Sequence, residues 1–189
     1  MSKSLLKLLP KIPFTYGEAM KKGFNINMLT KLIKEQKVER IERGIYRISN
    51  FDFTEEEQFI AATKKVQSKS AVTMLSALSY YDLTDIIPKQ VWLMVESQKR
   101  TQNKSIKLYR STNPHWNIGI IKEKGFCIVS IERAIVDSLT HKPIFPIRIG
   151  IEALKEAVRT KKVTLSKVVD MANKLGVREK IDPYIEVLI

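Results

Sequence analysis

The sequence predicts an α+β fold made of two domains. Segments with helical periodicity alternate with short apolar or alternating runs that are typical of strands. The 189 residues are 44% hydrophobic and 28% charged, which is enough apolar material for one large or two small domains. A break in these patterns at residues 49–53 places the boundary after residue 50. We therefore expect domains at 1–50 and 51–189.

Two short helices are expected near the start of the chain. Thr15 and Glu18 have the spacing of a capping box, which begins the first of these helices. Asn25 is a good N-cap for the second helix, over residues 26–36. Its apolar side chains, which we expect to pack inward, are Ile26, Leu29, Leu32 and Ile33. This arrangement predicts a helix-turn-helix.

A small basic β-hairpin follows the second helix. Residues 38–41 and 45–48 alternate as strands around a tight turn that contains Arg43, and Arg40 and Arg47 lie nearby on the strands. A helix-turn-helix followed by such a hairpin has the layout of a winged helix-turn-helix, a module that reads DNA.

The polar face of the second helix and the hairpin give the candidate DNA contacts. Amide, hydroxyl and ammonium groups suit the edges of bases in a major groove, and arginines on a hairpin suit phosphates or a minor groove. A solvated helix face is the alternative interpretation of the same pattern. The candidate residues are Asn25, Asn27, Thr30, Lys31, Lys34, Arg40, Arg43 and Arg47.

The charge of the chain favours a polyanionic partner. Its formal net charge is +13, from 33 Lys and Arg against 20 Asp and Glu. Residues 1–50 hold 11 basic and 4 acidic residues, a net charge of +7, and the other 139 residues carry +6. Nucleic acid, an anionic membrane surface and an acidic protein all fit such an excess. Its concentration in residues 1–50 points to the predicted DNA-reading module.

The second domain is predicted to contain two helices, a small antiparallel sheet and C-terminal helices. Residues 71–81 form one of the helices, and residues 91–96 and 106–110 form two strands. The polar, basic residues 97–105 between these strands most simply make a solvated hairpin loop. The alternative is a second set of phosphate contacts, from Lys99, Arg100 and Lys104.

A further helix is expected to begin at Ser130, which can cap it. Its apolar residues face inward, and Arg133 and Asp137 lie on the polar side as partners four residues apart. We interpret this pair as structural.

No catalytic chemistry is evident. His115 and His141 lie in loops without metal-ligand spacing, Cys127 lies in an apolar run, and no phosphate-binding or nucleophile motif occurs. Glu96 and Lys99 resemble part of a metal-dependent nuclease site, but the next strand supplies no acidic residue. We predict no enzymatic activity, metal or cofactor. The sequence also has no apolar run long enough to span a membrane and no signal peptide, so we expect a soluble cytoplasmic protein.

Three fragments together resemble the AbiEi family, the antitoxins of type IV toxin–antitoxin systems. The fragments are Arg43-Gly44-Ile45-Tyr46, Ser76-Ala77-Leu78 with Leu83 and Pro88, and Glu132-Arg133-Ala134 with Asp137. The resemblance implies an N-terminal winged helix-turn-helix that represses its own operon, and a C-terminal domain needed for antitoxicity. Two copies on an inverted repeat of operator DNA are the natural geometry for such a repressor. The resemblance also implies a nucleotidyltransferase-like toxin, which the antitoxin counters without a tight complex.

Two other functions remain open. One is a stand-alone winged-helix transcription regulator whose C-terminal domain binds a ligand or partner. The other is a nucleic-acid-processing enzyme. A neighbouring gene for a nucleotidyltransferase-like protein favours the antitoxin, an isolated gene favours the regulator, and metal-dependent cleavage that Glu96→Ala abolishes favours the enzyme.

Overall fold

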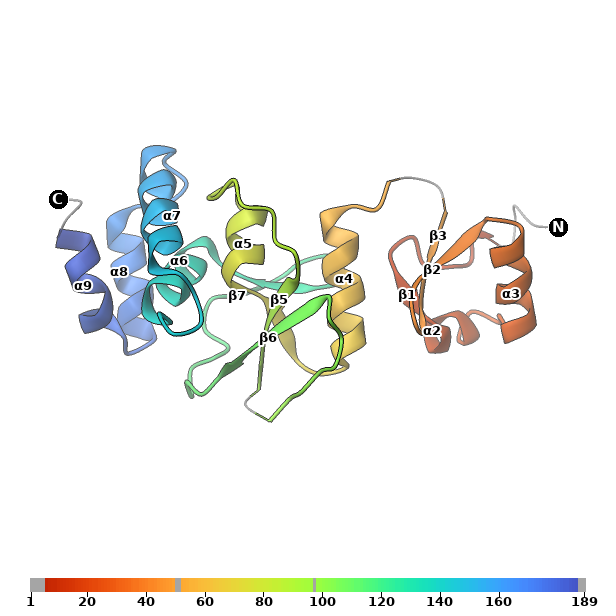
Figure 1. Cartoon of the computed structure of the whole chain (residues 1–189). Helices are drawn as coiled ribbons and strands as arrows, with labels where there is room; N and C mark the ends of the chain where they lie inside the picture. Colours follow the sequence, from red (N-terminus) through yellow and green to blue (C-terminus); the bar gives the residue numbers. More distant parts are fainter. Residues whose placement is uncertain (1–5, 50–51, 97, 187–189) are drawn as a thin grey trace. The chain divides into compact units, whose positions relative to one another are not determined.

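The chain forms two compact units, and both contain helices and strands (Figure 1). A computed structural model describes residues 6–49, 52–96 and 98–186. The first unit is Met1–Ser68 and the second is Lys69–Ile189. The predicted α+β fold class is confirmed.

The first unit combines helices with a three-stranded antiparallel sheet, in the strand order β1-β3-β2. Strand β1 comes before α2 and α3 in the chain and pairs with β3, which comes after them. The elements are β1 (Phe14–Thr15), α2 (Tyr16–Met20), α3 (Ile26–Lys34), β2 (Val38–Glu42), β3 (Ile45–Ile48) and α4 (Glu55–Val66).

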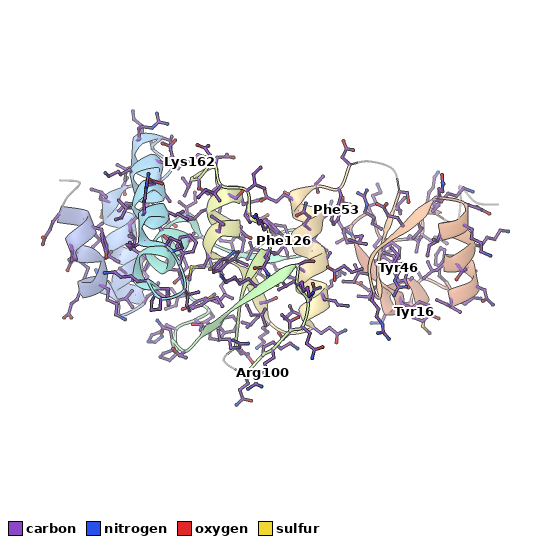
Figure 2. The ribbon with its side chains drawn as sticks, viewed as in Figure 1. Tyr16, Tyr46, Phe53, Arg100, Phe126 and Lys162 are labelled. Carbon is purple, nitrogen blue, oxygen red and sulfur yellow. The ribbon has the colours of Figure 1, made fainter. Side chains whose placement is uncertain are left out.

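An apolar core joins α2 and α3 to this sheet. Phe14 on β1 and Tyr46 on β3 stack with ring centroids 6.1 Å apart, and Tyr46 lies within the first unit in Figure 2. Leu29 and Leu32 bring the inner face of α3 into the same core. Burying such side chains contributes about 1.5–3 kcal/mol each, which fixes the rotation of α3 about its own axis.

The predicted capping box at Thr15 is confirmed. The Thr15 hydroxyl accepts a hydrogen bond from the Glu18 amide at 3.2 Å, and a Glu18 carboxylate oxygen accepts one from the Thr15 amide at 2.7 Å. We expect Thr15→Ala to destabilise the first unit by about 1 kcal/mol, because the helix then has unsatisfied amides. Hydrogen exchange of the amides in α2 and α3 measures this loss. Thr15→Ser is the matched control, and equal protection in both variants would contradict the role of the cap.

The first unit extends beyond the predicted boundary at residue 50. Helix α4 is bound to the preceding elements through Arg47 and Glu57, whose side chains form an ion pair at 2.8 Å, and through Lys64 and Glu18, which also pair. The Lys65 ammonium donates to the Arg43 carbonyl at 3.0 Å. These contacts join residues 10 to 46 positions apart, so the local break at residues 49–53 does not reveal them.

The second unit is a five-stranded sheet accompanied by five helices among the residues that the structure describes. Helix α6 contacts α5, α7, α8 and α9 and is the centre of the helical layer (Figure 1). The elements are β4 (Ser70–Val72), α5 (Met74–Tyr80), β5 (Val91–Glu96), β6 (Ile106–Ser111), β7 (Ile120–Lys122), β8 (Cys127–Val129), α6 (Ile131–Thr140), α7 (Ile147–Arg159), α8 (Leu165–Lys174) and α9 (Arg178–Glu186).

The sheet of the second unit is mixed, so the prediction of an antiparallel sheet is wrong. The strand order is β6-β5-β4-β8-β7, and the pairs β5–β6 and β4–β8 are parallel. Residues 98–105 therefore belong to a crossover and not to a hairpin loop. Nine residues can span roughly 30 Å, which is enough to return along a six-residue strand of about 20 Å.

The predicted helix at residues 71–81 is also shorter than expected. Its first residues belong to β4, which pairs with both β5 and β8 in the middle of the sheet, and α5 begins only at Met74. Ala71 and Val72 are small and apolar, so their pattern fits a buried strand as well as a buried helix.

Arg133 and Asp137 are buried, although the sequence places them on a polar helix face. Arg133 is 1% exposed and Asp137 is 3% exposed. The Arg133 Nε donates to both Asp137 carboxylate oxygens, at 2.9 and 3.1 Å. Its Nη1 donates to the carbonyl oxygens of Trp116 at 3.2 Å and Ile118 at 2.5 Å. The structural interpretation of the pair is confirmed, and its role is to hold the loop before β7 against α6.

Candidate nucleic-acid interface

Helix α3 is fixed at its start and along its inner face. The Asn25 side-chain oxygen accepts a hydrogen bond from the Met28 amide at 2.9 Å, as the sequence predicts for an N-cap. Leu29 and Leu32 are buried, whereas Ile26 is 50% exposed and was wrongly expected to pack inward. Ile26 is the first residue of the helix, where it points away from the core that Leu29 reaches one turn later.

The outer face of α3 carries the predicted polar side chains. Asn27, Thr30, Lys31 and Lys34 are all exposed. The Thr30 hydroxyl donates to the Ile26 carbonyl at 2.8 Å, so its oxygen remains available only as an acceptor. Asn25 is exposed too, but its oxygen serves the cap, which leaves its NH2 group for any ligand.

The hairpin presents two of the three predicted arginines. Arg43 lies in the turn and is exposed, and Gly44 beside it adopts a φ of +86°, a conformation that favours glycine. Arg40 is exposed on β2, and its Nε donates to the Glu42 carbonyl at 3.3 Å. This leaves the rest of the Arg40 guanidinium at the surface.

Arg47 belongs to the interior of the first unit, so its assignment as a DNA contact is wrong. Its residue exposure is 8%. Its guanidinium pairs with Glu39 on β2 and with Glu57 on α4, donates to the Asp52 carbonyl at 3.3 Å, and lies 5.1 Å from the centre of the Phe53 ring. The two carboxylates satisfy its charge. The alternation of β3 does not reveal this, because Glu57 lies beyond the predicted domain boundary.

A cavity of about 430 Å³ lies beside the hairpin turn, and sequence reasoning missed it. Arg43, Lys64 and Lys65 contribute cationic side chains to its lining. Burial acts to raise the pKa of Glu18, but hydrogen bonds from Lys64 and Thr15 and the Lys64 charge lower it overall. The neighbouring Lys64-Lys65 pair near the end of α4 is the sequence signal that could have extended the basic surface to this helix.

The carboxylate next to α3 is itself surrounded by cations. The hydrogen bond from the Lys37 ammonium lowers the pKa of Glu35, and the positive charge of Lys31 acts in the same direction. Glu35 and Lys37 form an ion pair at 2.6 Å. The end of α3 therefore keeps its positive character despite the acidic residue.

The predicted secondary phosphate contacts lie in the second unit, on the crossover between β5 and β6. Arg100 and Lys104 are exposed, and Arg100 projects away from the ribbon in Figure 2. Lys99 is half-buried, and its carbonyl accepts a hydrogen bond from Arg110 at 2.7 Å. No acidic residue occurs from position 97 to 122. The crossover is thus a second basic surface.

The observed units share the positive charge more evenly than the predicted domains do. Residues 1–68 hold 13 basic and 8 acidic residues, a net charge of +5. The remaining 121 residues hold 20 and 12, a net charge of +8. The acidic start of α4 causes the difference, because Glu55, Glu56 and Glu57 now belong to the first unit. Local placement on α3 and the hairpin, and not net charge, distinguishes the candidate interface.

No cluster of three His, Cys, Asp or Glu side chains that could hold a metal ion occurs among the described residues. Glu96, the residue that resembles part of a nuclease site, has Ser111 as its partner on β6. The helices within the described ranges include none that is both long and apolar enough to cross a membrane.

The comparisons with known proteins identify a similar fold. No protein-family model and no curated protein matches the sequence. Among solved structures, the chain is similar to the RV2827C protein from Mycobacterium tuberculosis, with a TM-score of 0.61 and 10% sequence identity. The similarity covers 97% of this chain and 78% of that one. At this identity, what the two proteins share is the fold.

Proposed function

We propose that the first unit is a winged helix-turn-helix that binds DNA, with α3 in the major groove. The observation that carries the proposal is the pairing of an exposed polar face on α3 with an exposed basic turn on the hairpin, in one compact unit. Asn27, Thr30 and Lys31 offer the groups that pair with base edges. Arg40 and Arg43 offer cations for the backbone or the minor groove.

The position of α3 supports this proposal physically. Leu29 and Leu32 hold the helix from one side, so the opposite face is rigid and open. A rigid helix loses little backbone conformational entropy on entering a groove, and an α-helix fits the width of the major groove. The alternative interpretation, a solvated helix face, involves the same residues but predicts no sequence-dependent binding of DNA.

Within this proposal, the protein is an antitoxin of the AbiEi type that also represses its own operon. The support is the resemblance of the sequence fragments around Arg43, Ser76 and Arg133. The partner would be a nucleotidyltransferase-like toxin encoded by a neighbouring gene. Co-expression tests this part: rescue of growth from the neighbouring gene's product supports an antitoxin, and no rescue by a stably expressed protein contradicts it.

DNA binding is tested with the double substitution Lys31→Ala and Arg43→Ala. We expect the variant to bind the DNA upstream of its own gene about 10- to 100-fold more weakly than the unchanged protein, because two cationic contacts are lost. A gel-shift titration at fixed salt measures this.

The matched control is Lys155→Ala with Lys161→Ala, which removes two exposed lysines from the second unit. This control lowers the net charge of the protein by the same amount as Lys31→Ala with Arg43→Ala. Equal affinity for the two double variants would show that net charge and not the α3 and hairpin surface governs binding.

A further inference from the structure

A cavity of about 430 Å³ lies in the second unit and has no role in the proposed DNA binding. Four parts of the chain line it: β6 near its end, the loop at residues 112–115, one side of α6 with the residue that follows it, and the turn between α8 and α9 with the start of α9. Its volume falls in the range of about 300–1,000 Å³ that is typical of small-molecule sites.

The cavity is formed in advance by hydrogen bonds around its rim. Arg133 holds the carbonyl oxygens of the loop before β7 in place from α6. The Asn113 side chain donates to the Leu175 carbonyl at 2.9 Å and accepts from the His115 amide at 2.8 Å. Asn113 thereby links the loop to the α8–α9 turn. A ligand would therefore find the walls already in position.

Several polar groups in the wall are already committed to one another. The His141 Nδ1 lies 2.8 Å from the Asp137 carbonyl oxygen, which can only accept, so Nδ1 carries the hydrogen. The Tyr109 hydroxyl contacts the His141 Nε2. Burial, with the nearby Asp137 charge, raises the pKa of Tyr109 and keeps its hydroxyl protonated. Both ring nitrogens of His141 therefore already have partners within the protein.

Lys180 adds a cationic group to the wall, and His115 and Thr112 add polar side chains. Lys180, His115 and Thr112 are exposed, and the Lys180 ammonium has no partner among the residues that the structure describes. Among the residues that the structure describes, Asp137 contributes the only carboxylate in the lining, and Arg133 pairs with it. Pro114, Leu175 and Val177 add apolar wall. A negative group is thus favoured beside Lys180, and an apolar body against Pro114, Leu175 and Val177.

We propose that this cavity binds a small organic anion, a phosphate monoester or a carboxylate, through an ion pair with Lys180. The anionic group lies at the rim beside Lys180, His115 and Thr112, and the apolar part contacts Pro114, Leu175 and Val177. This proposal does not rest on the proposed DNA binding, because the affinity for the anion is measured without DNA.

Titration calorimetry of the full-length protein at low salt tests the proposal with three probes that each carry one phenyl ring: phenyl phosphate, benzoate and benzyl alcohol. We expect saturable binding of at least one anion and none of the neutral alcohol. The anion that binds more tightly distinguishes a phosphate site from a carboxylate site. Failure of both anions to bind overturns the proposal.

Lys180→Gln is the decisive variant, with Lys155→Gln on α7 as the matched exposed lysine outside the cavity. We expect Lys180→Gln to weaken the anion by about tenfold or more, since a hydrogen bond to a charged group is lost, and Lys155→Gln to leave it unchanged. Thr112→Tyr, which fills the rim, should abolish binding. Tryptophan emission confirms that each variant is folded. Binding that Lys180→Gln and Thr112→Tyr both leave unchanged places the anion elsewhere and contradicts the assignment.

Discussion

Arg133→Met is expected to lower the free energy of unfolding of the second unit by about 3–5 kcal/mol, the usual cost of removing one partner from a buried ion pair. Asp137 would keep its carboxylate in a site that is 3% exposed, with no cation within the pair. The carbonyl oxygens of Trp116 and Ile118 would also lose their donor. The substitution therefore releases the loop before β7 and also leaves the buried Asp137 carboxylate without its cationic partner.

The chain offers a selective probe and a matched control for this measurement. Both tryptophans, Trp92 and Trp116, lie in the second unit, so their fluorescence during a urea titration reports that unit alone. Arg148→Met removes an arginine that is also paired four residues along its helix, with Glu152, but on the surface. We expect Arg148→Met to lower the free energy of unfolding by less than about 1 kcal/mol. Equal losses in the two variants would contradict a structural role for the buried pair.

The destabilisation by Arg133→Met should also depend on pH. Burial raises the pKa of Asp137, and the Arg133 charge opposes this rise. Without Arg133 the pKa of the folded state rises further, so the carboxyl binds its proton more readily in the folded than in the unfolded chain. Such a group stabilises the folded state at pH values below its pKa in the unfolded chain. This stabilisation is lost as the pH rises through its pKa in the folded chain. The difference in the free energy of unfolding between the variant and the unchanged protein should therefore be smaller near pH 5 than near pH 8.

Arg47→Met is expected to destabilise the first unit by about 2 kcal/mol, since Glu39 and Glu57 both lose a partner that is itself nearly buried. The guanidinium joins β2 and β3 to α4, so their amides should exchange hydrogen faster together. Exchange of peptides covering residues 38–66 measures the effect. It is the largest change that we expect in this unit.

Arg43→Met is the matched control for Arg47, because Arg43 is an exposed arginine on the same hairpin. We expect it to leave exchange unchanged and to weaken DNA binding. An Arg47→Met protein with unchanged exchange and lost DNA affinity would restore Arg47 to the set of DNA contacts and contradict its structural role.

Helix starts could be predicted from the sequence because their causes are local. Thr15, Asn25 and Ser130 each accept a hydrogen bond from an amide three residues ahead, as the sequence predicts. The same locality made the outer face of α3 predictable, since helical periodicity alone separates Lys31 from its buried neighbour Leu32.

Features that depend on distant partners could not be predicted. The parallel pairing of β5 with β6 and the central place of β4 are set by the whole sheet, whereas apolar runs such as Val91–Glu96 are equally compatible with a hairpin. Arg47 and Arg133 look like surface cations in sequence, and only Glu57 and the loop before β7 explain why they are buried. The cavity beside Lys180 brings together residues 71 positions apart, from Tyr109 to Lys180, so no local motif marks it.

The salt dependence of DNA binding tests the central proposal, that α3 and the hairpin turn contact DNA. Fluorescence anisotropy with the DNA upstream of the gene gives the affinity at a series of salt concentrations, for the unchanged protein and for Lys31→Ala, Lys34→Ala and Arg43→Ala combined. Each phosphate contact contributes about 0.9 to the slope of log affinity against log salt. We expect the triple variant to bind more weakly with a slope shallower by about 1–2, because Lys31 is assigned to base edges and the other two residues remain for phosphates. An unchanged affinity and an unchanged slope would contradict the proposal.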